Sequence, residues 1–126
     1  MASPDVENRR WTTAAALFGA SAVLLGAFGS HALRSRVAPA ELATWRTAVD
    51  FHLLHAVALL ALVIPPNDIQ RYRWCRRLFA VGITLFSGSL YALVLSGVLQ
   101  LGLITPFGGL CFTAGWLSLV WAARKR

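Results

Sequence analysis

The chain has 126 residues, of which 57% are hydrophobic and only 13% are charged, and its mean hydropathy is +0.61. A soluble domain of this size covers itself with polar side chains, so this composition excludes an ordinary soluble domain and indicates an integral membrane protein. The formal charge of +7 does not indicate nucleic-acid binding, because the basic residues adjoin long apolar runs instead of forming a basic face interleaved with aromatic rings. We therefore predict one all-α transmembrane domain over residues 1–126.

The first apolar segment, Trp11–Ala32, contains no Asp, Glu, Lys or Arg. As a helix it is about 33 Å long, enough to cross the hydrocarbon core of a bilayer. It is too long for the apolar part of a cleaved signal peptide, and the rest of the chain is equally apolar. We predict the first span over approximately residues 11–32.

The second segment is shorter, because only Phe51–Ile64 is free of Asp, Glu, Lys and Arg. A run of that length alone is typical of a buried or re-entrant piece. The helix can be extended back through Ala40–Asp50, where Arg46 and Asp50 are four residues apart and can pair. Apolar residues on one helical stripe support this extension: Leu42, Trp45, Val49 and Leu53. We predict a full span over residues 45–64, and a re-entrant segment remains the alternative.

Two further uncharged segments, at about 78–99 and 103–123, are joined by only a few residues and should form an antiparallel hairpin. Thr105 followed by Pro106 is typical of a helix N-cap and first turn. Small residues recur at four-residue spacing, which favours close helix packing in lipid: Ala15/Gly19, Ala22/Gly26, Gly88/Ala92/Ser96, Cys111/Gly115 and Ala114/Ser118. Together the four segments predict a membrane four-helix bundle with antiparallel neighbours and short loops.

Basic residues predict the orientation of this bundle. With four spans, both termini and the middle connection share one side, and positively charged residues favour the cytoplasm or the mitochondrial matrix. On that side we expect contacts to lipid headgroups from nine side chains: Arg9, Arg10, Arg71, Arg73, Arg76, Arg77, Arg124, Lys125 and Arg126. If the second segment is re-entrant, three spans remain and the N-terminus lies outside.

Polar residues within the apolar segments are candidates for function, because such groups are expensive in hydrocarbon. Counting about 1.5 Å per residue from the basic ends places His31 at the outer interface and His52 and His55 below it. Ser87, Ser89 and Tyr91 of the third segment fall at similar depths. We expect a polar layer in the middle-to-outer membrane, and take its candidate binding residues to be His31, His55, Ser87, Ser89 and Tyr91.

Several interpretations of this layer are open. Its side chains can satisfy one another and lock the bundle, or line a pocket for a quinone, haem or lipid, or relay protons. A metal site of His31, His52 and His55 is disfavoured by the difference in their depths. No catalytic motif is present, and Cys75 and Cys111 lack metal-type spacing and are expected to be free thiols. We assign no catalytic or metal-binding residue.

Four motifs in order resemble the YgdD-like family: Gly26–His31 (GAFGSH), Thr47–Ala56 (TAVDFHLLHA), Leu85–Tyr91 (LFSGSLY) and Ile104–Gly109 (ITPFGG), followed by Gly115-Trp116. These are small membrane proteins of bacterial inner membranes, with relatives in mitochondria. The resemblance implies four spanning helices, no established activity, and a location in a bacterial or mitochondrial inner membrane. His31 and His55 match the two histidines of the family, whereas Phe51 and His52 depart from its pattern.

We therefore expect a non-enzymatic integral membrane protein that serves as a small accessory or structural subunit of a larger membrane complex. Because the loops are short, partners would be met through helix faces. The alternative function is binding of a quinone, haem or lipid through the polar layer.

Overall fold

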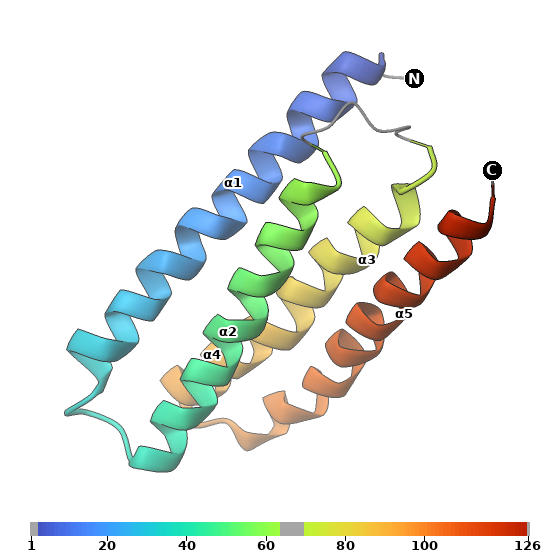
Figure 1. The fold of residues 1–126 in the computed structure, drawn as a ribbon. Coiled ribbons are helices and arrows are strands. Elements are labelled where there is room, and N and C mark those ends of the chain that lie inside the picture. The colour runs from blue at the N-terminus through green and yellow to red at the C-terminus, as the bar shows by residue number, and fades with distance from the viewer. Residues whose placement is uncertain (1–2, 64–69, 126) are drawn as a thin grey trace.

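The computed structural model describes residues 3–63 and 70–125, and every regular element in these ranges is helical. Four long rods run antiparallel to their neighbours (Figure 1). Both chain ends lie at one end of the molecule, together with the end of the second rod and the start of the third. The elements are α1 (Pro4–Phe28) continued by the π-helical turn η1 (Gly29–Leu33), α2 (Pro39–Ala61), α3 (Arg73–Gly82) continued by the π-helical turn η2 (Ile83–Ser87) and α4 (Gly88–Ser96), the 3₁₀ turn η3 (Leu99–Leu103), and α5 (Thr105–Arg124).

The helix ends follow local capping chemistry. The Ser3 hydroxyl accepts a hydrogen bond from the Val6 amide at 3.4 Å, and Pro4 stands at the first helical position, so α1 begins well before the apolar run. α2 begins at Pro39, as the extended second segment predicts. Its predicted end at residue 64 lies outside the described residues. α4 ends at Gly97, whose φ of 73° is the left-handed conformation that glycine adopts easily.

The start of α5 differs from the sequence prediction. Ile104 occupies the N-cap position without a side-chain capping bond, and Thr105 is already helical. The Thr105 hydroxyl instead lies 2.6 Å from the Ser89 hydroxyl of α4. A contact between helices has therefore replaced the expected local cap.

α2 and the third rod, which consists of α3, η2 and α4, form the centre of the molecule. α1 packs on α2, and α5 packs on α3 and η2. The close packing of α5 depends on glycine, because a Cβ on Gly108 would collide with the backbone of Phe86. A Cβ on Gly115 would lie 2.6 Å from the Phe79 ring. Glycine thus brings α5 close to the third rod, as in close-packed membrane helices. By contrast, Gly19 and Gly88 of the predicted small-residue pairs have open space around them.

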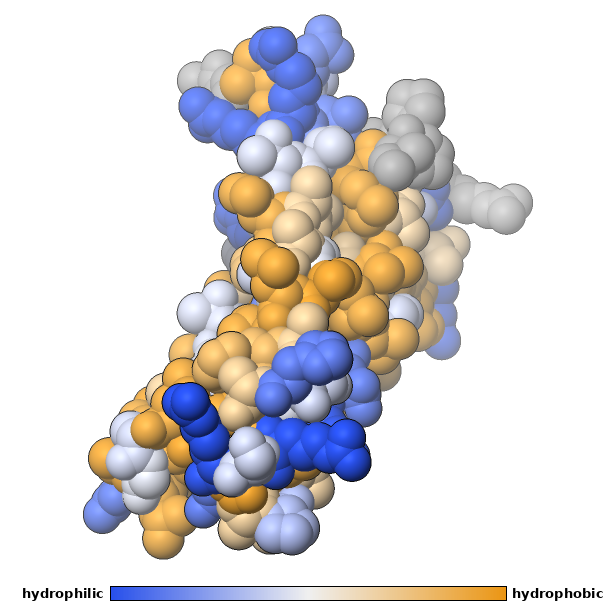
Figure 2. Space-filling model, turned by 90° about the vertical axis from the view of Figure 1, so that its left-hand side faces the viewer, coloured by the Kyte–Doolittle hydropathy of each residue, from blue (hydrophilic) through white to orange (hydrophobic). Residues whose placement is uncertain are grey.

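Within residues 3–63 and 70–125, three helical stretches are long and apolar enough to cross a membrane: Pro4–Leu33, Arg73–Ser96 and Leu99–Arg124. α2 is not among them, although its 23 residues, about 35 Å, run alongside the other rods. Arg46, Asp50 and two histidines lower its hydropathy. On the face shown in Figure 2, hydrophobic surface covers the middle, and hydrophilic atoms gather at the upper end and in the lower part.

Candidate functional site in the polar layer

His55 of α2 lies at the centre of an aromatic cluster and is only 2% exposed. Its ring stacks on Phe112 of α5 with the ring centroids 3.6 Å apart and the planes at 9°. Its Nδ1 lies 2.7 Å from the backbone oxygen of Phe51, and its Nε2 lies 3.1 Å from Nε1 of Trp116. The imidazole therefore joins α2 to α5.

These two contacts determine the tautomer of His55. The indole Nε1 is only a donor and the Phe51 oxygen is only an acceptor, so Nδ1 carries the proton and Nε2 accepts. Both nitrogens of the neutral ring are then satisfied. Binding a metal or haem iron through Nε2 would require Trp116 to move away.

His52, one helical turn earlier on α2, connects two other helices. Its Nδ1 lies 2.9 Å from the Tyr91 hydroxyl of α4, and its Nε2 lies 3.2 Å from the Ser21 hydroxyl of α1. Ser21 itself donates to the backbone oxygen of Phe18 at 3.0 Å. All donors find acceptors if Tyr91 donates to Nδ1 and Nε2 donates to Ser21, which gives His52 the tautomer opposite to that of His55.

The serines of the layer also make contacts between helices. The Ser87 hydroxyl, completely buried, donates to the backbone oxygen of Ala48 on α2 at 2.7 Å. The Ser89 hydroxyl lies 2.9 Å from the backbone oxygen of Phe86 and 2.6 Å from the Thr105 hydroxyl. Together with the histidines, these contacts connect all four rods.

Of the five predicted binding residues, His55, Ser87 and Ser89 are buried and Tyr91 is half-buried, and each hydrogen-bonds to groups outside the predicted set. His31 does not join them, because it is exposed in η1 beyond the end of α1. The predicted set lacks His52, which faces a cavity of about 220 Å³ between α1 and the third rod. The cavity is lined by Phe18, Ser21, Leu25, His52, Ile83, Thr84, Gly88 and Tyr91.

The position of His52 could have been found from helical spacing. The buried residues of α2 are Trp45, Ala48, His52, His55, Ala56 and Leu59, which repeat every three or four positions. His52 lies on this stripe three residues before His55, so both imidazoles point inward. In the described part of the chain, no three His, Cys, Asp or Glu side chains gather where a metal ion would fit.

The basic side chains predicted to contact lipid headgroups include both exposed and buried residues. Arg9, Arg10 and Arg124 are exposed, Lys125 lies 3.7 Å from the centroid of the Trp121 ring, and Arg126 is outside the described residues. Arg76 differs, because it is 1% exposed and its Nη2 lies 3.8 Å from Oε1 of Glu7 on α1. This burial argues against the predicted headgroup contact for Arg76.

Arg71 also makes a contact within the protein. Its Nε and Nη2 donate to the backbone oxygen of Ala122 in the last turn of α5, at 3.1 and 2.9 Å. The Lys125 amide donates to the same carbonyl at 3.3 Å, so the guanidinium adds a second, charged donor at the negative end of the α5 dipole. Arg73 and Arg77 lie against the Trp74 ring, 5.5 and 5.7 Å from its centroid.

Comparison with known proteins agrees with the four motifs. Residues 25–109 match the family described as "Protein of unknown function (DUF423)". A UPF0382 membrane protein of Staphylococcus aureus is 40% identical over 111 residues, covering 87% of this chain and 91% of that protein. The UPF0382 membrane protein YwdK of Bacillus subtilis is 38% identical over 110 residues, covering 82% of this chain and 87% of that protein.

The UPF0382 inner membrane protein YgdD of Escherichia coli is 39% identical over 118 residues, covering 89% of this chain and 88% of that protein. No solved structure matches the chain. The predicted resemblance is thereby confirmed over most of the sequence. The chain belongs to the DUF423 family, together with these membrane proteins of bacteria.

Proposed function

We propose that this protein is a four-span integral membrane protein that acts as a small, non-enzymatic subunit of a larger membrane assembly. One observation carries the proposal: buried polar groups of the bundle are engaged in hydrogen bonds within the protein. His55, with both nitrogens bonded, and Ser87, bonded to the α2 backbone, are used to hold helices together. His55 is 2% exposed and Ser87 is completely buried, so both side chains are enclosed by the packed helices that they join.

The burial of Trp45, His52 and His55 on α2 supports a fourth span. Trp45, His52 and His55 lower the hydropathy of α2, yet each is buried against other helices. A helix whose polar stripe is covered by neighbours needs less overall hydropathy than one exposed to lipid. With four spans, the positive residues place both termini on the cytoplasmic side of a bacterial inner membrane.

Thiol labelling tests this topology. In a variant with Cys75 and Cys111 replaced by alanine, a single cysteine is introduced either at Ser35, in the α1–α2 connection, or at Asn8, near the N-terminus. A membrane-impermeant maleimide added to intact cells should label position 35 and not position 8. Labelling at position 8 would refute the four-span orientation.

Apolar side chains on α5 are suited to contacts with other membrane proteins. Leu110, Leu117 and Val120 of α5 are 65%, 63% and 52% exposed and lie on the side away from the third rod. A photoreactive amino acid at Leu117 should give a discrete adduct of higher mass in native membranes. The same group at the buried Phe112 serves as the control. The subunit role is refuted if position 117 gives only lipid adducts and the protein purified in mild detergent has the mass of a monomer.

A second function is favoured by the cavity beside His52. Its walls are mostly apolar, and Ser21, His52 and Tyr91 supply the polar groups, a combination typical of sites for small lipophilic molecules such as quinones. Protein purified in mild detergent should then carry an extractable lipophilic molecule that is lost in Gly88→Leu, which would fill the cavity. An unchanged extract from Gly88→Leu would contradict binding at this place.

A further inference from the structure

Two hollows adjoin each other between α1 and the third rod. One is the cavity beside His52, and the other has a volume of about 240 Å³ and is lined by Phe18, Ala80, Val81, Thr84 and Leu85. Phe18 of α1 and Thr84 of η2 line both hollows, so together they form one elongated groove, here called the α1 groove. The groove has a polar end at His52 and an apolar end at Ala80.

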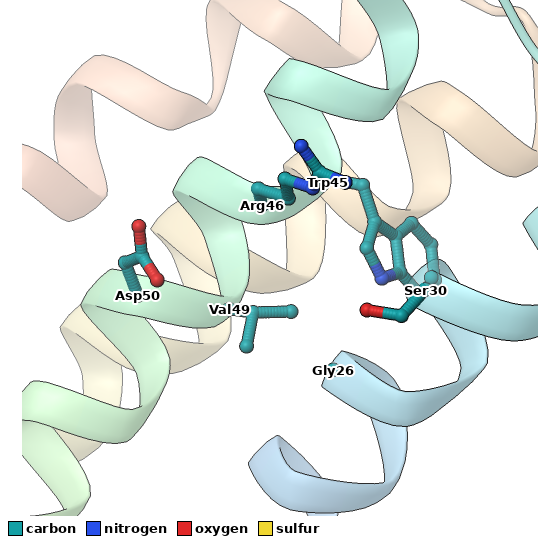
Figure 3. A pocket seen from close by; sticks show the side chains of 7 residues that line it. Gly26, Ser30, Trp45, Arg46, Val49 and Asp50 are labelled. Carbon is teal, nitrogen blue, oxygen red and sulfur yellow. The ribbon is translucent and has the colours of Figure 1, made fainter. Parts of the chain in front are cut away.

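The polar end of the α1 groove is held in place by Trp45, which is 1% exposed. Its ring centroid lies 4.7 Å from that of Tyr91, and its Nε1 donates to the backbone oxygen of Leu25 at 2.8 Å. Figure 3 shows the Trp45 ring extending from α2 towards α1. Tyr91 and Leu25 line the cavity from different helices, so its walls are formed before any ligand binds. The groove also runs along the π-helical turn η2, a rare geometry often found at functional sites.

The polar hydrogens at this end are used within the protein. The Ser21 hydroxyl donates to the backbone oxygen of Phe18 at 3.0 Å. Because its hydrogen is used there, Ser21 accepts from Nε2 of His52, 3.2 Å away. A neutral imidazole has one N–H, so Nδ1 is the acceptor, and the Tyr91 hydroxyl donates to it at 2.9 Å.

Thr84 follows the same pattern, since its hydroxyl donates to the backbone oxygen of Ala80 at 3.0 Å. The hydroxyl oxygens of Ser21, Thr84 and Tyr91 can still accept, whereas none of the described side chains that line the groove keeps a hydrogen to donate. Among the described residues, no Asp, Glu, Lys or Arg lines the groove either. His52 is 4% exposed, and with no acidic side chain in the groove its ring stays neutral.

A third hollow, between α1 and α2, has a different chemistry (Figure 3). Arg46 and Asp50 of α2 are among its lining residues. Both are exposed, and within the described residues no ion pair joins them, so the pair predicted from their four-residue spacing is not formed. Charged walls favour a charged ligand, whereas the uncharged walls of the α1 groove favour a neutral one.

We propose that the α1 groove binds a neutral lipophilic molecule that carries a hydroxyl at its head and an extended apolar tail. The ligand hydroxyl donates to the oxygen of Ser21 or Tyr91, and the tail lies in the hollow beside Ala80. A carbonyl head, as in a quinone, would place its lone pairs against these oxygens and find no donor. The proposal rests on the second function proposed above, and it narrows the ligand class to hydrogen-bond donors.

Three ligands with the same decyl tail test this on the full-length protein in mild detergent: 4-decylphenol, 4-decyltoluene and decyl-1,4-benzoquinone. The phenol has a donor, the toluene has a methyl group of similar size in its place, and the quinone has only acceptors. The unfolding temperature, followed by circular dichroism, rises as ligand binds and gives each dissociation constant. We expect 4-decylphenol to bind roughly three- to tenfold tighter than either of the others, the effect of one hydrogen bond. Equal binding of the phenol and the toluene, or tighter binding of the quinone, would overturn the proposal.

Two pairs of variants locate the ligand. Gly88→Leu fills the polar end and should abolish binding of 4-decylphenol, whereas Gly19→Leu makes the same change on α1 outside the groove and should retain it. Ala80→Leu fills the apolar end and should weaken binding severalfold. Its control is Ala92→Leu, at an exposed alanine of the same rod outside the groove, which should leave binding unchanged. Unchanged binding in Ala80→Leu would contradict the placement of the tail.

The hydrogen-bond pattern is checked without a ligand by nuclear magnetic resonance on protein with ¹⁵N-labelled histidine. His52 should carry its proton on Nε2 and His55 on Nδ1, with the signals of His52 assigned by their loss in His52→Gln. A proton on Nδ1 of His52 would leave the Tyr91 hydroxyl able to donate and would overturn the need for a ligand hydroxyl.

The proposal and the second function can fail separately. Binding of 4-decylphenol that persists in Gly88→Leu would refute binding in the cavity, and both would fall. Binding that is lost in Gly88→Leu but shows no preference for the phenol over the quinone would refute the donor requirement alone.

Discussion

The contact between α5 and the third rod allows a sharp test with two adjacent glycines. A Cβ on Gly108 would lie 2.7 Å from Cα of Phe86 and closer still to its backbone nitrogen. A Cβ on Gly109 would have only Cδ2 of Phe86 within reach, at 3.9 Å. Both glycines are in the first turns of α5. Gly108→Ala and Gly109→Ala therefore make the same chemical change on the same helix in opposite steric surroundings.

The expected magnitudes follow from these distances. Ordinary contact begins at 3.4 Å, so Gly108→Ala forces α5 and the third rod apart by roughly 1 Å, since backbone atoms cannot rotate away. Overpacking of this kind costs about 1–3 kcal/mol. Gly109→Ala meets no such obstacle and gains up to about 1 kcal/mol from the higher helix propensity of alanine. Because the propensity gain is common to both variants, their free energies of unfolding should differ by the overpacking cost, about 1–3 kcal/mol.

Tryptophan fluorescence provides the assay. Both variants are unfolded from mild detergent by increasing mole fraction of dodecyl sulfate, and the free energy of unfolding is extracted from each transition. The sensitive ring is Trp116, which contacts His55 and Phe79 in the folded state. If Gly108→Ala were as stable as Gly109→Ala, the close approach of α5 to Phe86 would be wrong.

Three further predictions use the same unfolding assay. Trp116→Phe removes the donor to Nε2 of His55 and leaves a buried acceptor unsatisfied, so it should cost about 1–3 kcal/mol; an unchanged stability would show that Nε2 has another partner. Ser87→Ala removes a hydrogen bond between helices and should cost about 0.6 kcal/mol, at most about 1.7, as measured for such bonds in membranes, so a cost above 3 kcal/mol would contradict a simple interhelical bond. Gly97→Ala should cost about 1–2 kcal/mol because Gly97 has a φ of 73°, whereas Gly88→Ala, in open helical surroundings, should be neutral or stabilising. Equal effects of the two glycine changes would rule out the left-handed end of α4.

The positions of the three histidines show what spacing along one helix predicts about burial and what it cannot predict about contacts. The interior position of His55 follows from its place on α2, and depth counting brings it level with Ser87 and Tyr91. The same counting placed His31 at the outer interface, above the layer, and the structure has that ring exposed in the turn η1. His52 departs from the family pattern and was left out of the predicted binding residues, and it bonds to Ser21 and Tyr91 on two other helices.

The glycines show a similar division. Four-residue spacing correctly marked Gly115 but also marked Gly19 and Gly88, which face open space. It missed Gly82 and Gly108, which allow the closest contacts with Phe112 and Phe86. Spacing within a helix identifies a face of small side chains, whereas the residues that pack on that face depend on the rotation of the neighbouring helix.

The basic residues divide in the same way. Sequence alone predicted that they gather at one end of the apolar segments, because they adjoin the ends of those segments along the chain. Only the tertiary structure decided which of them are engaged within the protein: Arg76 lies buried beside Glu7, and Arg71 donates to the last turn of α5.

Composition and local periodicity thus predicted the all-helical fold and the order of its segments, and four sequence motifs carried the resemblance to a membrane protein family. Tertiary packing alone decided that Arg46 and Asp50, a predicted pair, stand apart in a hollow beside Trp45. The physical reason is common to these cases. Apolar patterning acts along one helix, whereas each hydrogen bond and close contact depends on the rotation and depth of two helices at once.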